Sequence, residues 1–166
     1  MKSTKLVPNI SLKISNAHKQ ALKIMYSSNP DFEKAKKLLI LAAEKNDYIA
    51  IYALGTWHFS GVHGFIENKA EAIRLWEIAA AKKVPEALFD LAVSYETGIG
   101  IKVNLRKAFS LYVDAALRGD HQAVFAVGRC YFYGIGTSKN KLLADIWFDK
   151  AEELGVFEAD NLNEKQ

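Results

Sequence analysis

Apolar residues recur along the 166-residue chain with the spacing of amphipathic helices, and short turns rich in glycine or asparagine separate the apolar segments. The pattern predicts alternating first and second helices. The first helices are predicted over residues 47–60, 84–97 and 120–133, and the second over residues 68–82, 104–118 and 140–154. Pro85 falls at a first helical turn, where a missing backbone N–H costs little. The chain is therefore predicted to be all-α.

The predicted helices recur with a period of about 36 residues. Alanines mark this period at Ala35, Ala72, Ala108 and Ala144, which are 37, 36 and 36 residues apart. A fixed period of this length indicates stacked helical units, each of which buries its apolar face only against its neighbours. We therefore expect one domain over residues 1–166. Its expected parts are a degenerate N-terminal unit at 16–46, repeats at 47–83, 84–119 and 120–154, and a C-terminal cap at 155–166.

Each predicted helix pair carries local signals for its turn. The first helix is followed by a glycine that can adopt the left-handed conformation of a helix end, at Gly61, Gly98 and Gly134. The second helix is preceded by an asparagine, whose side-chain oxygen can cap a free backbone N–H, at Asn68, Asn104 and Asn140. Glu71 lies three residues after Asn68 and is expected to complete a capping box.

Small residues recur in the first helices, at Gly55, Ala92 and Gly128. Without bulky side chains at these positions, two helices can approach closely. The space between them is expected to be filled by aromatic residues of the second helices, Trp76, Tyr112 and Trp147. A large residue in place of Gly128 should overpack a helix crossing and destabilise the fold by about 1–3 kcal/mol.

The net charge of +3 is too small to indicate a nucleic-acid-binding protein, but the charge is unevenly distributed. Residues 1–46 hold nine lysines against three acidic residues, which gives +6, and residues 149–166 hold six acidic residues against two lysines, which gives −4. We interpret both ends as solvated caps, with head-to-tail association as the alternative. The lysines of the basic end are not interleaved with base-stacking aromatic residues, and this end lacks a long basic amphipathic helix with a Trp/Phe face. We therefore expect no nucleic-acid or membrane ligand, and a monomer or weak self-association.

Cysteine content and hydropathy bear on the compartment. Cys130 is the only cysteine, so no intrachain disulfide can form, which fits a reducing compartment. Its place on a packed helix favours a buried, inert thiol. No apolar stretch of about 18 residues could span a bilayer, and residues 1–16 lack the apolar core of a signal peptide. We therefore expect a cytoplasmic protein.

Two segments resemble a known repeat. The run AVFAVGRCYFYGIG, from Ala123 to Gly136, is similar to the first half of a Sel-like repeat of the Sel-one type, and KAEAIRLWEIAA, from Lys69 to Ala80, is similar to its second half. This repeat resembles the tetratricopeptide repeat but is slightly longer, and the resemblance covers residues 47–154. It implies a right-handed α-α superhelix, or solenoid, with a concave face lined by the first helices. It also implies an adaptor or regulator, and the bacterial immunity proteins among small members imply a toxin inhibitor as the alternative.

Sequence signals for catalysis are weak. Gly98-Ile99-Gly100 and Gly134-Ile135-Gly136 follow predicted helices rather than strands, which indicates periodic turns instead of a phosphate-binding loop. The match of Ser138 and Lys141 to Ser-x-x-Lys lacks its companion motifs. His58 and His63 could approach each other, but three or four converging metal ligands are not evident. We therefore predict a non-enzymatic protein without cofactor or metal, and keep a hydrolase with a site in the superhelical groove as a further alternative.

The predicted binding surface consists of first-helix positions that lie away from the recurring core positions. The candidate partner-binding residues are Tyr52, Thr56, Phe59, Val93, Glu96, Arg129, Phe132 and Tyr133. Phe89 and Phe125, one period apart, are assigned either to this surface or to the packing between adjacent repeats. Aromatic residues and arginine are enriched at protein interfaces, so the expected ligand is another protein, for example a toxin or an effector. Replacing Arg129 or Phe132 by Ala is expected to cost about 2 kcal/mol or more of binding.

Overall fold

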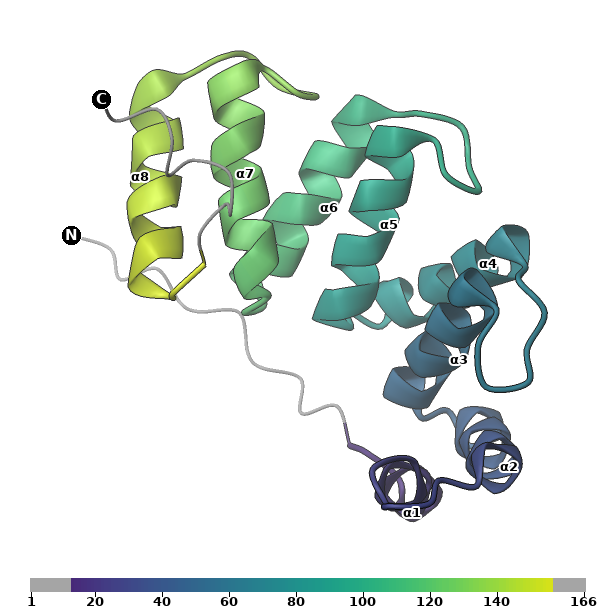
Figure 1. Cartoon of the computed structure of the whole chain (residues 1–166). Coiled ribbons are helices and arrows are strands. Elements are labelled where there is room, and N and C mark those ends of the chain that lie inside the picture. The colour runs from purple at the N-terminus through teal and green to yellow at the C-terminus, as the bar shows by residue number, and fades with distance from the viewer. Residues whose placement is uncertain (1–12, 157–166) are drawn as a thin grey trace.

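The computed structural model describes residues 13–156, and all regular secondary structure in this range is α-helical. The helices are α1 (Asn16–Met25), α2 (Phe32–Glu44), α3 (Tyr48–Ser60), α4 (Lys69–Ala81), α5 (Pro85–Thr97), α6 (Leu105–Leu117), α7 (His121–Tyr133) and α8 (Lys141–Glu153). They pack most closely as consecutive pairs, α1 with α2, α3 with α4, α5 with α6 and α7 with α8. Figure 1 shows the four pairs following a curved path. The predicted all-α fold of stacked helix pairs is confirmed.

The asparagine and glycine signals at the helix ends act as predicted. All six helices predicted in the three full pairs begin and end within one residue of the predicted bounds. The side-chain oxygens of Asn68, Asn104 and Asn140 each accept a backbone N–H at 3.0 Å. Gly61, Gly98 and Gly134 follow the first helices with φ angles of 64°, 79° and 78°, a left-handed conformation that costs glycine little.

The capping box predicted at Asn68 is wrong. The carboxylate of Glu71 binds Arg74 instead, with oxygen–nitrogen distances of 2.7 and 2.8 Å. The backbone N–H of Asn68, which the capping box would satisfy, donates to the carbonyl oxygen of His58 at 2.8 Å. The equivalent bond recurs in the next two pairs, from Asn104 to Tyr95 and from Asn140 to Tyr131. Each turn is therefore closed by a bond from the asparagine back to the first helix.

Glycines in the first helices allow close crossings with the second helices. A Cβ atom on Gly55 would lie 2.6 Å from Cδ1 of Trp76, and a Cβ atom on Gly128 would lie 2.7 Å from Cδ1 of Phe148. The assignment of Trp147 to the third crossing is therefore wrong. Phe148 lies two periods of 36 residues after Trp76, so it is the residue in register, whereas Trp147 packs against the neighbouring core cluster around α6 and α7.

A buried carboxylate fixes the N-terminal pair to the rest of the stack. Asp47, which is 3% exposed, accepts hydrogen bonds from the backbone N–H of Ser15 at 2.7 Å and of Ala50 at 3.0 Å. Nδ1 of His18 lies 3.3 Å from both of its oxygens. Burial alone would raise the pKa of Asp47, but these hydrogen bonds hold the pKa below its usual value. One side chain thus joins the start of α1 to the start of α3.

None of the helices in the described range is long and apolar enough to cross a membrane. The C-terminal cap predicted at 155–166 falls outside the described residues from position 157 onward.

Candidate functional site

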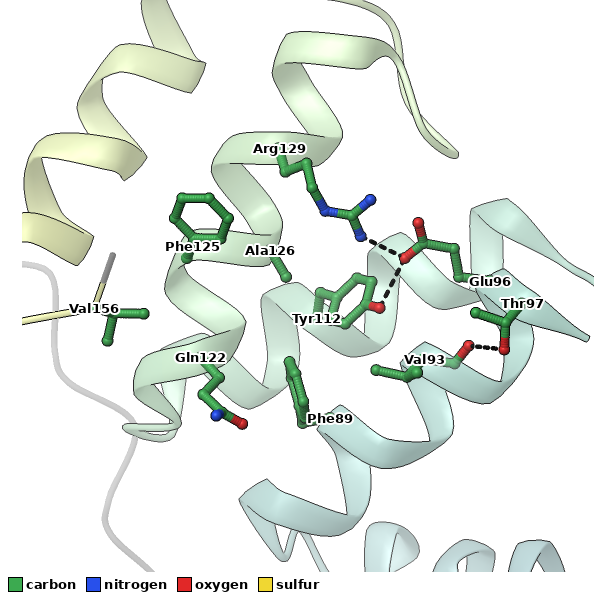
Figure 2. A pocket seen from close by; sticks show the side chains of 10 residues that line it. All are labelled: Phe89, Val93, Glu96, Thr97, Tyr112, Gln122, Phe125, Ala126, Arg129 and Val156. Carbon is green, nitrogen blue, oxygen red and sulfur yellow. Dashed lines mark hydrogen bonds and ion pairs between the residues drawn. The ribbon is translucent and has the colours of Figure 1, made fainter. Parts of the chain in front are cut away.

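An open groove in the described part of the chain lies between α5 and α7, and we call it the α5–α7 groove. Its volume is about 630 Å³ and it is open to solvent. It is lined by Phe89, Val93, Glu96 and Thr97 of α5, Tyr112 of α6, Gln122, Phe125, Ala126 and Arg129 of α7, and Val156. Figure 2 shows the side chains of α5 and α7 facing one another across this space. Most of its exposed surface is apolar, which suits apolar side chains of a ligand.

A charged network crosses one end of the α5–α7 groove. Oε2 of Glu96 accepts a hydrogen bond from the Tyr112 hydroxyl at 2.8 Å and from Nη2 of Arg129 at 2.7 Å (Figure 2). Burial alone would raise the pKa of Glu96, but the bonds from Arg129 and Tyr112 lower it below its usual value. The Glu96 bond also raises the pKa of Arg129. The network keeps both groups charged and holds α5, α6 and α7 in fixed relation.

A smaller and more enclosed pocket lies between α3 and α5, and we call it the α3–α5 pocket. Its volume is about 230 Å³. It is lined by Thr56 and Phe59 of α3, Trp76 of α4, Asp90, Val93, Ser94 and Thr97 of α5, and Ile99. Val93 and Thr97 line both cavities, so the pocket and the groove form one continuous surface along α3, α5 and α7.

Asp90 is the acidic residue of the α3–α5 pocket. Its Oδ2 accepts a hydrogen bond from the Tyr52 hydroxyl at 3.0 Å. The pKa of Asp90 is raised to about 6, mainly by burial and also by the nearby charges of Asp120 and Glu86, while the Tyr52 bond partly opposes this rise. No Lys, Arg or His within residues 13–156 forms an ion pair with Asp90.

The structure brings six of the eight predicted binding residues to this continuous surface. Val93, Glu96 and Arg129 line the α5–α7 groove, and Thr56 and Phe59 line the α3–α5 pocket. Tyr52 lies beside the pocket through its bond to Asp90. Phe132 and Tyr133, which are 45% and 58% exposed, lie at the end of α7 outside both cavities. Phe89 and Phe125, left open by the sequence, both line the groove.

Sequence reasoning missed Asp90 and gave Tyr112 and Trp76 only a core role. Asp90 had a usable signal, because it stands one period from Ala53 and from Ala126, where a small apolar residue is otherwise found. A carboxylate at a position held by alanine in the neighbouring repeats is typical of a local function. Tyr112 and Trp76 offered no such signal, since both are buried and also reach a cavity.

Two histidines and the cysteine of the described range have packing roles. His63 stacks on Phe32 with ring centroids 4.0 Å apart, and His58 meets the ring of Phe65 edge to face at 4.5 Å. No group of three or more His, Cys, Asp or Glu residues within residues 13–156 is arranged to hold a metal ion. Cys130 is fully buried, as predicted, and burial raises the pKa of its thiol to about 11. A thiol in this state is a poor nucleophile.

Comparison with known proteins gives relatives that share this architecture. The chain is 31% identical over 103 residues to chitin synthase regulatory factor 3 of Schizosaccharomyces pombe. The matched region covers 61% of this chain and 11% of that protein. The crystal structure of a protective antigen from uropathogenic Escherichia coli with an SLR fold superposes with a TM-score of 0.78 and 27% identity, covering 84% of this chain and 30% of the other. A Sel1 repeat protein from Oxalobacter formigenes gives a TM-score of 0.76, also at 27% identity, over 84% of this chain and 40% of the other.

The chain therefore corresponds to a small part of the curated relative and to less than half of either structure. The Sel1 repeat itself matches this chain four times, over residues 26–47, 49–84, 85–120 and 121–156. These matches cover most of the chain; the last three coincide with the pairs α3–α4, α5–α6 and α7–α8, and the first covers α2 without α1. The chain belongs to the Sel1 repeat family, as its sequence resemblance implied.

Proposed function

We propose that this chain is a non-enzymatic protein-binding module that holds a segment of a partner protein along the surface formed by α3, α5 and α7. Sel1 repeat proteins are typically protein-interaction scaffolds, and the relative from Schizosaccharomyces pombe is named as a regulatory factor. The single observation that supports this surface is the continuity of the α5–α7 groove with the α3–α5 pocket.

The shape and lining of the surface favour a polypeptide ligand. A groove of about 630 Å³ that is open along its length suits an extended segment better than a small molecule, which is usually enclosed on most sides. Phe89 and Phe125 offer aromatic contacts, and the Glu96–Arg129 pair offers charged groups at one end. Aromatic side chains and arginine are the types that most often dominate binding energy at protein interfaces.

The proposal is tested by site-specific photo-crosslinking in the native lysate. Benzoylphenylalanine is placed at Gln122 or Thr97, which are exposed and line the groove. Leu142, 70% exposed on α8, takes the same group as the matched control. The proposal expects one protein to be cross-linked from both groove positions and not from Leu142. Equal cross-linking from all three positions, or a partner captured only from Leu142, would refute the assignment of this surface.

A further inference from the structure

Within residues 13–156, Asp90 differs from the other half-buried carboxylates of the helices because it has no basic partner there. Glu96 binds Arg129 at 2.7 Å, and Asp114 binds Lys83 and Arg118, each at 2.8 Å. Asp90 is also half-buried, yet within residues 13–156 its one side-chain hydrogen bond comes from Tyr52. A carboxylate withdrawn from water without a counterion costs free energy that a bound cation can recover.

The surroundings of Asp90 strengthen its attraction for a cation. Glu86 on the same helix and Asp120 at the start of α7 add negative charge nearby. Lys69 of α4 is a basic residue beside the pocket wall, but it already has partners. Its ammonium group donates to the Phe59 carbonyl and lies 3.4 Å from Glu67. The pocket therefore presents a net negative charge to a ligand.

The α3–α5 pocket has the size and lining of a site for one long side chain. Its volume of about 230 Å³ is below the range of about 300–1,000 Å³ that small-molecule and cofactor sites usually occupy. Phe59 and Trp76 form part of its apolar wall, and the ammonium group of Lys69 already lies 3.9 Å from the centroid of the Phe59 ring. Lysine and arginine bury their aliphatic stems against apolar walls while the charged end reaches a polar group. Asp90 is such a group in this pocket.

We propose that the α3–α5 pocket receives one lysine or arginine side chain from the protein segment that lies in the adjoining α5–α7 groove. This inference rests on the proposed function and adds a chemical requirement for the partner. Because Val93 and Thr97 line both cavities, a segment in the groove passes the mouth of the pocket. Charge complementarity then fixes which residue of the segment enters it.

The test selects ligands from a displayed library of random dodecapeptides, with the purified chain as bait. The variant D90N keeps the shape of the side chain and an acceptor for the Tyr52 hydroxyl but removes the charge. The matched control is D149N, which removes one acidic charge on the exposed face of α8. Selected peptides are then synthesised with the enriched basic residue or with norleucine, and their Kd values are measured by calorimetry.

We expect wild type and D149N to enrich Lys or Arg at one fixed position, and D90N to lose this enrichment. Norleucine in place of the basic residue should raise Kd about tenfold or more for wild type and change it little for D90N. Binding of the basic peptide should weaken as pH falls through about 6, because protonation of Asp90 removes its charge. The norleucine peptide should show no such dependence.

Four results would overturn the inference. One is selection of peptides without a basic preference, which rejects the basic side chain but leaves the binding module intact. Another is a basic preference that D90N retains, which places the contact elsewhere. The third is that putrescine binds with the same Kd as the peptide, which would assign the pocket to a free small cation. A chain that selects no peptide also rejects the inference, whereas the cross-linking experiment decides the proposed function separately.

Discussion

At the crossing of α3 and α4, residue 55 has almost no room for a side chain, and the variant Gly55→Ala tests this close packing. On an exposed helix this change stabilises by about 1 kcal/mol, because alanine has the higher helix propensity. At this crossing, the new Cβ would lie 2.6 Å from Cδ1 and 2.7 Å from Nε1 of Trp76, and 3.3 Å from the Ala72 carbonyl oxygen. Trp76 is 3% exposed and packed in the core, so its ring cannot move aside freely.

Overpacking of a core contact costs about 1–3 kcal/mol. Subtracting the propensity gain leaves a net loss of up to about 2 kcal/mol for Gly55→Ala. In a domain of this size each kcal/mol corresponds to about 2–4 °C in Tm. Thermal unfolding followed by circular dichroism should therefore show a lower Tm. The equivalent variant Gly128→Ala should lose less, because the facing Phe148 is only half-buried and can shift.

A double-mutant cycle identifies the cause of the loss. Nε1 of Trp76 has no hydrogen-bond partner within the described residues, so Trp76→Phe shortens the ring without breaking a bond. The double variant of Gly55 and Trp76 should be less destabilised than the sum of the single variants, by about 1 kcal/mol. A rise in Tm for Gly55→Ala alone, as helix propensity predicts, would refute the argument from close packing.

Three further outcomes follow from the polar groups and the thiol. Glu96→Ala leaves Arg129 and Tyr112 without their shared acceptor and should lower the free energy of unfolding in urea by about 1.5–3 kcal/mol; a change within error would show that the network adds no stability. Asp47 has a pKa below its usual value in the folded state, so its stabilisation is complete above the unfolded pKa of about 3.9 and is lost as pH falls through the folded pKa. Acid unfolding should consequently be shallower in Asp47→Asn than in wild type, and identical slopes would contradict this. Cys130 should react with a disulfide reagent only after denaturant is added, because it is buried and its thiol pKa is about 11; rapid reaction of the native protein would contradict its burial.

The helix pairs could be predicted from the sequence because their signals are local. An asparagine cap or a left-handed glycine acts within one turn of the chain, so its effect does not depend on distant residues. One error was local, because Glu71 binds Arg74 instead of completing a capping box. The other arose where a contact partner had to be chosen between helices. Trp147 and Phe148 are adjacent aromatic residues, and only the helical phase decides which of them faces Gly128. Counting two full periods from Trp76 would have identified Phe148.

The candidate site was harder to predict because it depends on side chains from different repeats. The first-helix phase placed Val93 and Arg129 on the face that lines the α5–α7 groove. The helical phase does not show which side chains of two different helices bind each other, so the Glu96–Arg129 bond between α5 and α7 could not be derived from it. Phe132 is exposed outside the groove, and this position likewise depends on where the groove ends. Asp90 could have been found, since its charge breaks a series of small apolar residues.

The proposed binding surface does not repeat, although the helical core beneath it does. Core positions keep one residue type through the stack, as at Ala50, Ala87 and Ala123. On the surface, the position that is Phe59 in α3 is Glu96 in α5 and Phe132 in α7, and the position that is Ala53 is Asp90 and Ala126. A bound segment shifted by one repeat would therefore meet a phenylalanine where Glu96 should lie and an alanine where Asp90 should lie. Because such mismatches leave charged groups unpaired, the surface can select one register and one direction of its ligand, although the backbone that carries it is periodic.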